Sequence, residues 1–351
     1  IVCMNGETPN TVIAGLTLTG GTGTLNPVWQ TLQGGGIFIY TASPTVVNCV
    51  LTLNTSEFGG GGIWAQNSQS YFANLRFDDN HALLETRGGG GLYLWNSSAT
   101  VSRCSFSNNT ADSGGGLRCK GGGSANVRLC SFVNNTASEF GGGVAVTSAT
   151  PSFDRCLFRG NVAGSYGGGV STGGVLTTFL NCHFRENVAN TTGGAIRIND
   201  GGAELDGCDF ASNLAGLGGG GIVVNDSACT VTRGSFQEND GTANGGAIHL
   251  TGVSSVDVDF TSFCGNQPTA ISGDWNDLGG NAIDASCSIT CPGDIDGNGT
   301  VDLMDALSLI AQWGQCDGIT SCFADQNDDG QVNVVDLIIV IENFGLCPPP
   351  P

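Results

Sequence analysis

The sequence has almost no lysine and no long apolar run. Lys120 is its only lysine, and 11 basic residues stand against 31 acidic ones, which gives a net charge of −20. Nucleic acid and anionic membrane surfaces would be repelled by such a chain, so the charge argues against both as partners. No stretch of ~18 consecutive apolar residues occurs, so we expect no membrane insertion.

Most of the chain also lacks helical periodicity and instead repeats one short pattern. A Phe-x-x-Asn motif returns every 26 residues, and its copies begin two residues earlier at Cys104, Cys130, Cys156, Cys182, Cys208 and Gly234. Between the copies lies a glycine cluster followed by an apolar residue, as in Gly143-Val144. A constant period of this length indicates a solenoid.

Each repeat has the pattern of short strands. Apolar residues alternate after the glycines, as in Val144 and Val146, and a second short strand carries the motif phenylalanine. We therefore predict a parallel β-helix with one coil per repeat and ~4.8 Å between coils. The motif asparagines should stack at one turn and hydrogen-bond between coils, and the glycines should form another turn where the backbone is tight or has positive φ.

The pairing of a Gly-Gly-Ala-Ile type strand with Phe-x-x-Asn resembles the repeats of the polymorphic outer-membrane protein family and, more broadly, right-handed parallel β-helix repeat proteins. The resemblance covers roughly residues 11–270. It implies a mainly β solenoid in a secreted or cell-surface protein, exported by a bacterial type of secretion, that adheres rather than catalyses. The chain opens in mid-pattern at Ile1 without a signal peptide, so we expect that an N-terminal segment was removed or lies outside this sequence.

The fifteen cysteines fall into two groups. Seven are expected to be small core residues, because they occupy repeated inward positions: Cys49, Cys104, Cys119, Cys130, Cys156, Cys182 and Cys208. The other eight are candidates for disulfides: Cys3, Cys229, Cys264, Cys287, Cys291, Cys316, Cys322 and Cys347. Their number suggests an oxidising, extracytoplasmic setting.

One outward position per coil forms a ladder along the first strand. Its members are Phe38, Trp64, Tyr93, Arg118, Ala145, Ser171, Arg197, Val223 and His249. The first three, with Tyr40 and Trp95 two residues on, predict an exposed aromatic row that binds a sugar or another subunit. The alternative is that a loop such as 20–33 covers them.

The search for catalytic groups yields no predicted catalytic residue. The ladder carries no acidic cluster, and the only compact group of acids with histidine is Asp78, Asp79 and His81 at the asparagine turn. A solvated corner is the better interpretation of this group. His183 stands in a variable repeat position and is expected at the surface.

The last 61 residues change in character and contain a tandem repeat of 31 residues. Each copy places oxygen-bearing side chains at loop positions 1, 3, 5 and 12 and glycine at position 6, which is the pattern of a calcium loop. The position 7 residue contributes its backbone carbonyl. The predicted ligands of two calcium ions are Asp294, Asp296, Asn298, Thr300 and Asp305, and then Asp325, Asn327, Asp329, Gln331 and Asp336. An amphipathic helix follows each loop.

This duplicated loop and helix closely resembles a type I dockerin, which implies docking onto a cohesin domain. Dockerins often carry Ser-Thr at loop positions 10 and 11, whereas this chain has apolar pairs there. With two residues of the second helix, these pairs predict an apolar docking face for another partner or for this protein's own β-helix: Leu303, Met304, Val334, Val335, Ile339 and Val340. The alternative is that they fill the core between the two helices.

A helix of about 12 residues is ~18 Å long, which separates the cysteines at its two ends too far for a bridge. If the two helices pack antiparallel, we expect Cys316–Cys322 and Cys291–Cys347 disulfides.

We divide the chain into a β-helix over 1–266, a cap and linker over 267–290, a dockerin-like domain over 291–347 and a proline tail over 348–351.

Two functions follow. The first is a non-catalytic structural or adhesive protein, extracellular or at the cell surface, whose dockerin-like module docks onto a cohesin-like domain or onto another copy. Docking of the module onto the aromatic row of another copy would build a filament. The alternative is a polysaccharide-acting enzyme, a lyase or glycoside hydrolase, carried to a scaffold by its dockerin. The missing acidic cluster favours the first.

Overall fold

A computed structural model describes residues 1–28, 30–83, 88–284, 293–295, 300–315, 324–326 and 331–346. The chain forms two compact units, residues 1–285 and 286–351, and each is described by itself.

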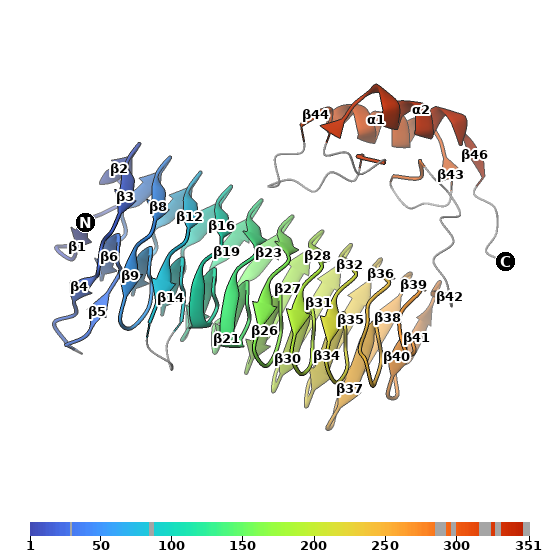
Figure 1. Cartoon of the computed structure of the whole chain (residues 1–351), viewed down its shortest axis with the longest axis horizontal. Coiled ribbons are helices and arrows are strands. Elements are labelled where there is room, and N and C mark those ends of the chain that lie inside the picture. The colour runs from blue at the N-terminus through green and yellow to red at the C-terminus, as the bar shows by residue number, and fades with distance from the viewer. Residues whose placement is uncertain are drawn as a thin grey trace. The chain divides into compact units, whose positions relative to one another are not determined.

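The first unit is a parallel β-helix whose coils stack side by side (Figure 1). Three parallel sheets of 11 strands run along it, and a fourth has 7 strands. Sheet A contains β1 (Val2–Cys3), β6 (Ile37–Tyr40), β10 (Ile63–Gln66), β14 (Leu92–Trp95), β18 (Leu117–Lys120), β22 (Val144–Thr147), β26 (Val170–Gly173), β30 (Ile196–Asn199), β34 (Ile222–Asn225), β37 (Ile248–Thr251) and β40 (Ile271–Ser272).

Sheets B and C carry the middle of each coil. Sheet B contains β2 (Val12–Ala14), β7 (Thr45–Val47), β11 (Tyr71–Ala73), β15 (Thr100–Ser102), β19 (Asn126–Arg128), β23 (Ser152–Asp154), β27 (Leu176–Leu180), β31 (Gly202–Asp206), β35 (Ala228–Thr232), β38 (Ser255–Asp259) and β41 (Asn276–Gly279). Sheet C contains β3 (Thr17–Thr19), β8 (Val50–Thr52), β12 (Arg76–Asp78), β16 (Ser105–Ser107), β20 (Ser131–Val133), β24 (Leu157–Arg159), β28 (His183–Arg185), β32 (Asp209–Ala211), β36 (Ser235–Gln237), β39 (Ser262–Cys264) and β42 (Ala282–Asp284).

The fourth sheet, sheet D, lies between the asparagine turn and the glycine turn. It contains β9 (Thr55–Ser56), β13 (His81–Ala82), β17 (Thr110–Ser113), β21 (Thr136–Phe140), β25 (Val162–Ala163), β29 (Val188–Ala189) and β33 (Leu214–Ala215). A hairpin of β4 (Thr24–Leu25) and β5 (Leu32–Gln33) interrupts the first coil. The predicted second strand of each repeat is in fact two strands. The chain bends between sheets B and C at the residue before the motif cysteine, which has positive φ, as at Arg103 and Leu129.

The β-helix extends further than the repeat pattern. Residues 267–290 were expected to be an irregular cap and linker, but β40, β41 and β42 pair in parallel with the preceding coil. That part of the prediction is wrong, because backbone pairing continues where the side-chain period has stopped. Residues 285–290 lie outside the described part of the chain.

The interior is built from stacked identical side chains. The motif phenylalanines are fully buried and stack nearly parallel from coil to coil, with 4.7 Å between the ring centroids of Phe106 and Phe132. The seven cysteines predicted inside are all buried and free. The six thiols in the motif position donate to backbone carbonyls, for example Cys156 Sγ to Val127 O at 3.6 Å. The predicted core is therefore confirmed.

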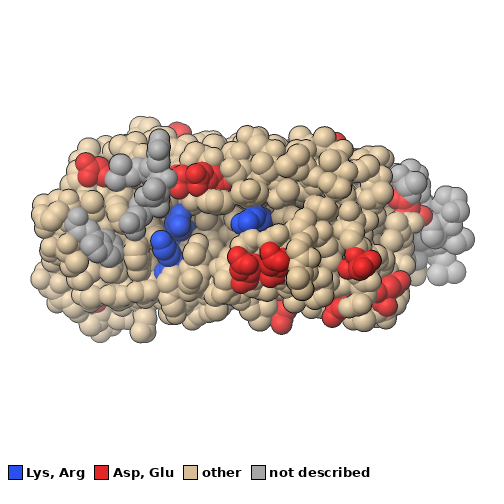
Figure 2. Space-filling model, turned by 90° about the horizontal axis from the view of Figure 1, so that it is seen from below, with Lys and Arg blue, Asp and Glu red and all other residues tan. Residues whose placement is uncertain are grey.

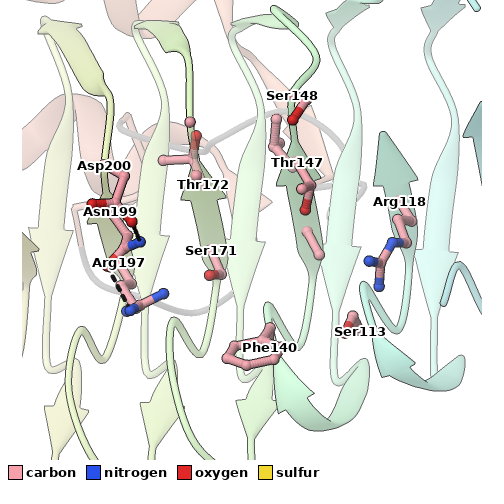
Figure 3. Close-up of a pocket in the computed structure, with 14 residues that line it drawn as sticks. Ser113, Arg118, Phe140, Thr147, Ser148, Ser171, Thr172, Arg197, Asn199 and Asp200 are labelled. Atoms are coloured by element: carbon pink, nitrogen blue, oxygen red, sulfur yellow. Dashed lines mark hydrogen bonds between the residues drawn. The ribbon is translucent and has the colours of Figure 1, made fainter. Parts of the chain in front are cut away.

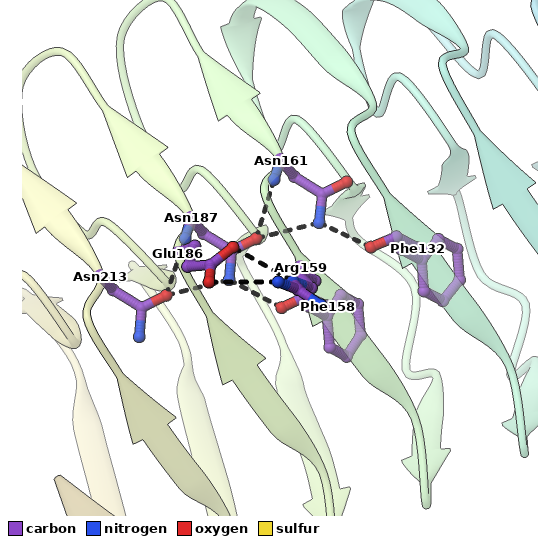
Figure 4. A network of polar contacts seen from close by, with 7 residues as sticks. All are labelled: Phe132, Phe158, Arg159, Asn161, Glu186, Asn187 and Asn213. Carbon is purple, nitrogen blue, oxygen red and sulfur yellow. Dashed lines mark hydrogen bonds and ion pairs between the residues drawn. The ribbon is translucent and has the colours of Figure 1, made fainter. Parts of the chain in front are cut away.

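The predicted asparagine ladder is also confirmed (Figure 4). Asn161 Nδ2 donates to Asn187 Oδ1 at 2.9 Å and to Phe132 O at 2.8 Å. Asn161 Oδ1 accepts from the Nδ2 and backbone N–H of Asn135, both at 3.0 Å. Each buried amide thus bonds to the coil before its own and to the coil after it, which fixes the register of the stack.

The glycine turn needs glycine for space. A Cβ on Gly115 would lie 2.5 Å from Gly142 O and 2.6 Å from Thr136 O, closer than any side chain allows. Gly114 beside it has φ +68°, which other residues adopt only with strain.

The second unit contains two helices, α1 (Leu303–Ala311) and α2 (Val334–Glu342). Two short antiparallel pairs join the two repeats: β43 (Thr300–Val301) with β46 (Gly345–Leu346), and β44 (Gly314–Gln315) with β45 (Gln331–Val332). The strand before each helix therefore pairs with the strand after the other helix, as a duplicated motif related by a pseudo-two-fold would do.

Candidate docking and calcium-binding site

Each helix of the second unit begins with a buried carboxylate from the predicted calcium loop before it. Asp305 is fully buried, its Oδ1 accepts from Ile295 N–H at 2.7 Å, and its Oδ2 accepts from Asp302 N–H at 2.8 Å. Asp336 is equally buried and accepts from Gln326 N–H and Asn333 N–H, both at 2.8 Å. The carboxylate at loop position 12 thus ties the start of its loop to the first turn of its helix.

The residues present suit calcium. An ionised carboxylate can accept about four contacts, so two N–H donors are compatible with a cation on the same group. The donor set is all oxygen, which is what calcium prefers. The described ligand candidates are Asp294, Thr300, Asp305, Asp325, Gln331 and Asp336, and the other four, Asp296, Asn298, Asn327 and Asp329, lie outside the described residues. Within the described ranges alone, no cluster of three or more acidic, histidine or cysteine side chains forms a metal site.

Each helix uses a narrow face for the core and leaves a broad apolar face exposed. The core contains Ala306 and Leu309 of α1 and Val340 of α2, with Leu337 packed against it. Leu303, Met304, Leu307, Ile310 and Trp313 are all exposed by about half or more, and so are their counterparts in the second repeat, Val334, Val335, Ile338, Ile341 and Phe344. Exposed apolar side chains at this density mark an interaction surface.

The predicted docking face is mostly exposed. Leu303 is 64%, Met304 58%, Val334 57% and Val335 46% exposed, so these four do not fill the core between the helices. Val340 is wrongly assigned to the docking face, because it is fully buried in the core. Ile339 is half-buried. The exposure of the rest of the broad face was not predicted, because the apolar side of an amphipathic helix is normally the buried one.

The predicted aromatic row of the β-helix is wrong as an exposed surface. Phe38, Trp64 and Tyr93 are fully buried in a cluster of their own, and Tyr40 and Trp95 are partly buried against it. Phe58, from the turn before β10, folds over the row, with its ring centroid 5.7 Å from that of Trp64. The backbone of the 20–33 excursion holds this turn, because Phe58 N–H donates to Leu32 O at 3.1 Å.

The acid and histidine group at the asparagine turn is structural. Asp78 accepts from Arg76, Ser107 and Asn108. Partial burial raises the pKa of Asp78, but the hydrogen bonds from Ser107, Arg76 and Asn108 and the charge of Arg76 outweigh it and leave that pKa below its usual value. His81 Nδ1 lies 2.6 Å from Thr110 Oγ1. His183, expected at the surface, is buried, with Nδ1 2.9 Å from Asp209 Oδ2.

The disulfide predictions have mixed outcomes. Cys264 is disulfide-bonded, whereas Cys3 and Cys229 are free and buried, so the suggested bridges are wrong for those two. The predicted Cys291–Cys347 and Cys316–Cys322 pairs, and Cys287, lie outside the described residues.

A trough on sheet A was not predicted. Its volume is about 320 Å³, its floor is Ala145 and Ser171, and Arg118 and Arg197 stand at its two ends (Figure 3). These four residues are consecutive members of the outward ladder. The sequence therefore contained a pattern that predicts a trough: two small residues stand between two arginines in a ladder of otherwise larger side chains. Basic side chains gather near the middle of the face shown in Figure 2, with acidic ones beside them.

Comparison with known families agrees with these two units. A model described as a right handed beta helix region matches residues 10–175, and a dockerin type I domain matches residues 292–345. No curated protein and no solved structure matches the chain. None of the helices in the described residues is long and apolar enough to cross a membrane. The chain is thus a right-handed parallel β-helix protein that carries a C-terminal dockerin type I domain.

Proposed function

We propose that this chain is a non-catalytic extracellular β-helix protein whose dockerin domain, loaded with two calcium ions, joins it to a cohesin partner. Dockerin type I domains bind calcium and cohesin partners, and dockerin-bearing proteins are generally extracellular or on the cell surface. The observation that carries the proposal for this chain is the apolar pair exposed at the start of each helix, directly after a calcium loop.

Calcium would order the docking face through the loop carboxylates. Asp305 and Asp336 link each loop to the first turn of its helix, and Leu303 and Val334 are the first residues of those helices. Calcium bound to the loop would also be held by this carboxylate, so the start of the helix would be fixed. The apolar pair is then held in one orientation for the partner, which lowers the entropy cost of binding.

Two observations support a non-catalytic β-helix. In the group of acids and histidine at the asparagine turn, Asp78 is held by three donors and His81 contacts Thr110. Among the described residues that line the trough on sheet A, the single carboxylate is Asp200, which lies at the end that carries Arg197 (Figure 3). Paired carboxylates, the usual means of glycoside hydrolysis, therefore do not occur in this described lining. The aromatic row cannot join copies of the protein into a filament, because its side chains are buried.

The test is calorimetric titration of the full chain with a panel of cohesin domains. Leu303→Asp with Met304→Asp removes one apolar pair, Val334→Asp with Val335→Asp removes the other, and a third variant combines them. Because each side chain is about half exposed, the combined variant should bind at least about 100-fold more weakly, as expected when a hydrophobic contact is replaced by buried charge.

The matched control places the same new charges on exposed apolar positions of the β-helix. Leu176 and Leu217 are 49% and 54% exposed, so Leu176→Asp with Leu217→Asp should leave cohesin binding unchanged. Equal loss in the control, or full binding by the combined variant, would rule out the helix faces as the docking surface.

A further inference from the structure

We propose that the trough on sheet A binds an acidic sugar, with an anionic group of the sugar held by Arg118. This site lies on the β-helix and is independent of the docking proposed above. The argument depends on the state of Arg118, on the second arginine and on the groups between them.

Arg118 is a buried cation with unused donors. It is only 8% exposed, and among the described residues its Nε and Nη1 have no hydrogen-bond partner. Its guanidinium lies over the ring of Tyr93, with 5.8 Å between Cζ and the ring centroid. Buried guanidinium groups are normally paired, because an unpaired buried charge is costly. An anionic ligand entering the trough would supply the missing acceptor.

Arg197 stands at the opposite end of the trough. Its Cζ lies 4.4 Å from the centroid of Tyr166, and its Nη2 donates to Asn199 Oδ1 at 2.7 Å, so its position is fixed in advance. Three strand steps separate the two arginines, or ~14 Å along the β-helix axis. Figure 3 shows both guanidinium groups turned toward the space between them. Two fixed cations at this separation suit an elongated ligand with anionic groups along its length.

The groups between the arginines favour a sugar over a peptide. Ser171, Thr147 and Asn199 offer hydroxyl and amide groups that can donate to and accept from sugar hydroxyls. Phe140 lines the trough, and its ring stacks on Tyr166 with 5.7 Å between centroids, which provides a flat apolar wall. An extended peptide binds best by pairing with a free strand edge. The strands under the trough, β22 and β26, are already paired on both sides, so they offer no edge.

The experiment is calorimetric titration of the full chain with three oligosaccharides of equal length: an oligouronate, a sulfated oligosaccharide and the neutral methyl ester of the oligouronate. We expect saturable binding of at least one anionic sugar and none of the ester. Arg118→Met and Arg197→Met should each weaken that binding by about 10- to 100-fold, the usual loss for a charge-assisted hydrogen bond. Binding of the uronate alone would assign the site to carboxylates, and binding of the sulfated sugar alone would assign it to sulfates.

The controls separate binding from folding. Arg128→Met changes an exposed arginine on β19 of sheet B and should bind as the parent does. Arg118→Met should unfold at the same denaturant concentration as the parent or a higher one, because it removes a buried unpaired charge. The proposal is overturned if neither anionic sugar binds, if the ester binds as tightly, if Arg118→Met binds as the parent does, or if poly-glutamate binds and no sugar does.

Discussion

Replacing Asn161 with alanine should remove one rung of the asparagine ladder and strongly destabilise the β-helix. The side chain makes four hydrogen bonds: Nδ2 donates to Phe132 O and Asn187 Oδ1, and Oδ1 accepts from two nitrogens of Asn135. At a net value of about 1 kcal/mol for each hydrogen bond, the loss is about 4 kcal/mol. Alanine also leaves the carbonyl of Phe132 without this buried donor, so the loss should not be smaller than about 3 kcal/mol.

The assay is urea unfolding followed by far-ultraviolet circular dichroism, with the slope of the free energy against urea compared between variants. Asn126→Ala is the control, because Asn126 is an exposed residue of β19 outside the ladder, and its effect should stay within about 0.5 kcal/mol. A loss below about 1 kcal/mol for Asn161→Ala, at an unchanged slope, would refute the view that the amide ladder holds the coils in register.

Three further predictions concern protons, thiols and calcium. Asp78 has a pKa below its usual value, so the stability that it contributes should be present above about pH 4 and should be lost as the pH falls through that lower pKa. Unfolding curves measured between pH 2 and 6 should show that Asp78→Asn lacks this part of the acid dependence. Burial raises the pKa of the Cys119 thiol to about 12, so a thiolate-directed reagent should label this cysteine only after the protein unfolds. Mass spectrometry of the peptides measures the labelling, and rapid labelling of Cys119 in the native protein would contradict its buried position. Asp305→Ala should abolish calcium binding by the first loop and Asp336→Ala by the second, and calorimetry that still finds two sites in either variant would exclude that carboxylate as a ligand.

The repeat could be predicted from the sequence because the fold repeats with it. Each coil places the same residue at the same point, so Phe106 and Asn161 reveal their inward positions by recurrence alone. Where the sequence stops repeating, this signal is lost although the backbone still pairs, and the coil formed by β40, β41 and β42 was missed for that reason.

The errors at the candidate sites have a common physical origin. Recurrence predicts which way a side chain points, but it does not predict what covers it. Trp64 points outward as predicted, yet the non-repeating Phe58 packs over it. On α2, the face that packs in the core depends on how the helix leaves its calcium loop, so Val340 is buried and Val335 exposed. The trough was not predicted, because neither acidic nor aromatic side chains create it; the small size of Ala145 and Ser171 does.

The measurement that tests the central claim most directly is the titration of the full chain with cohesin domains in calcium and again after chelation. The account predicts a saturable complex in calcium that disappears with the chelator and returns when calcium is restored. It also predicts that the variant with aspartate in place of Leu303, Met304, Val334 and Val335 binds calcium normally but binds cohesin at least about 100-fold more weakly. A complex of unchanged affinity in the chelator, or with that variant, would contradict the claim that the calcium-bound helices carry the docking surface.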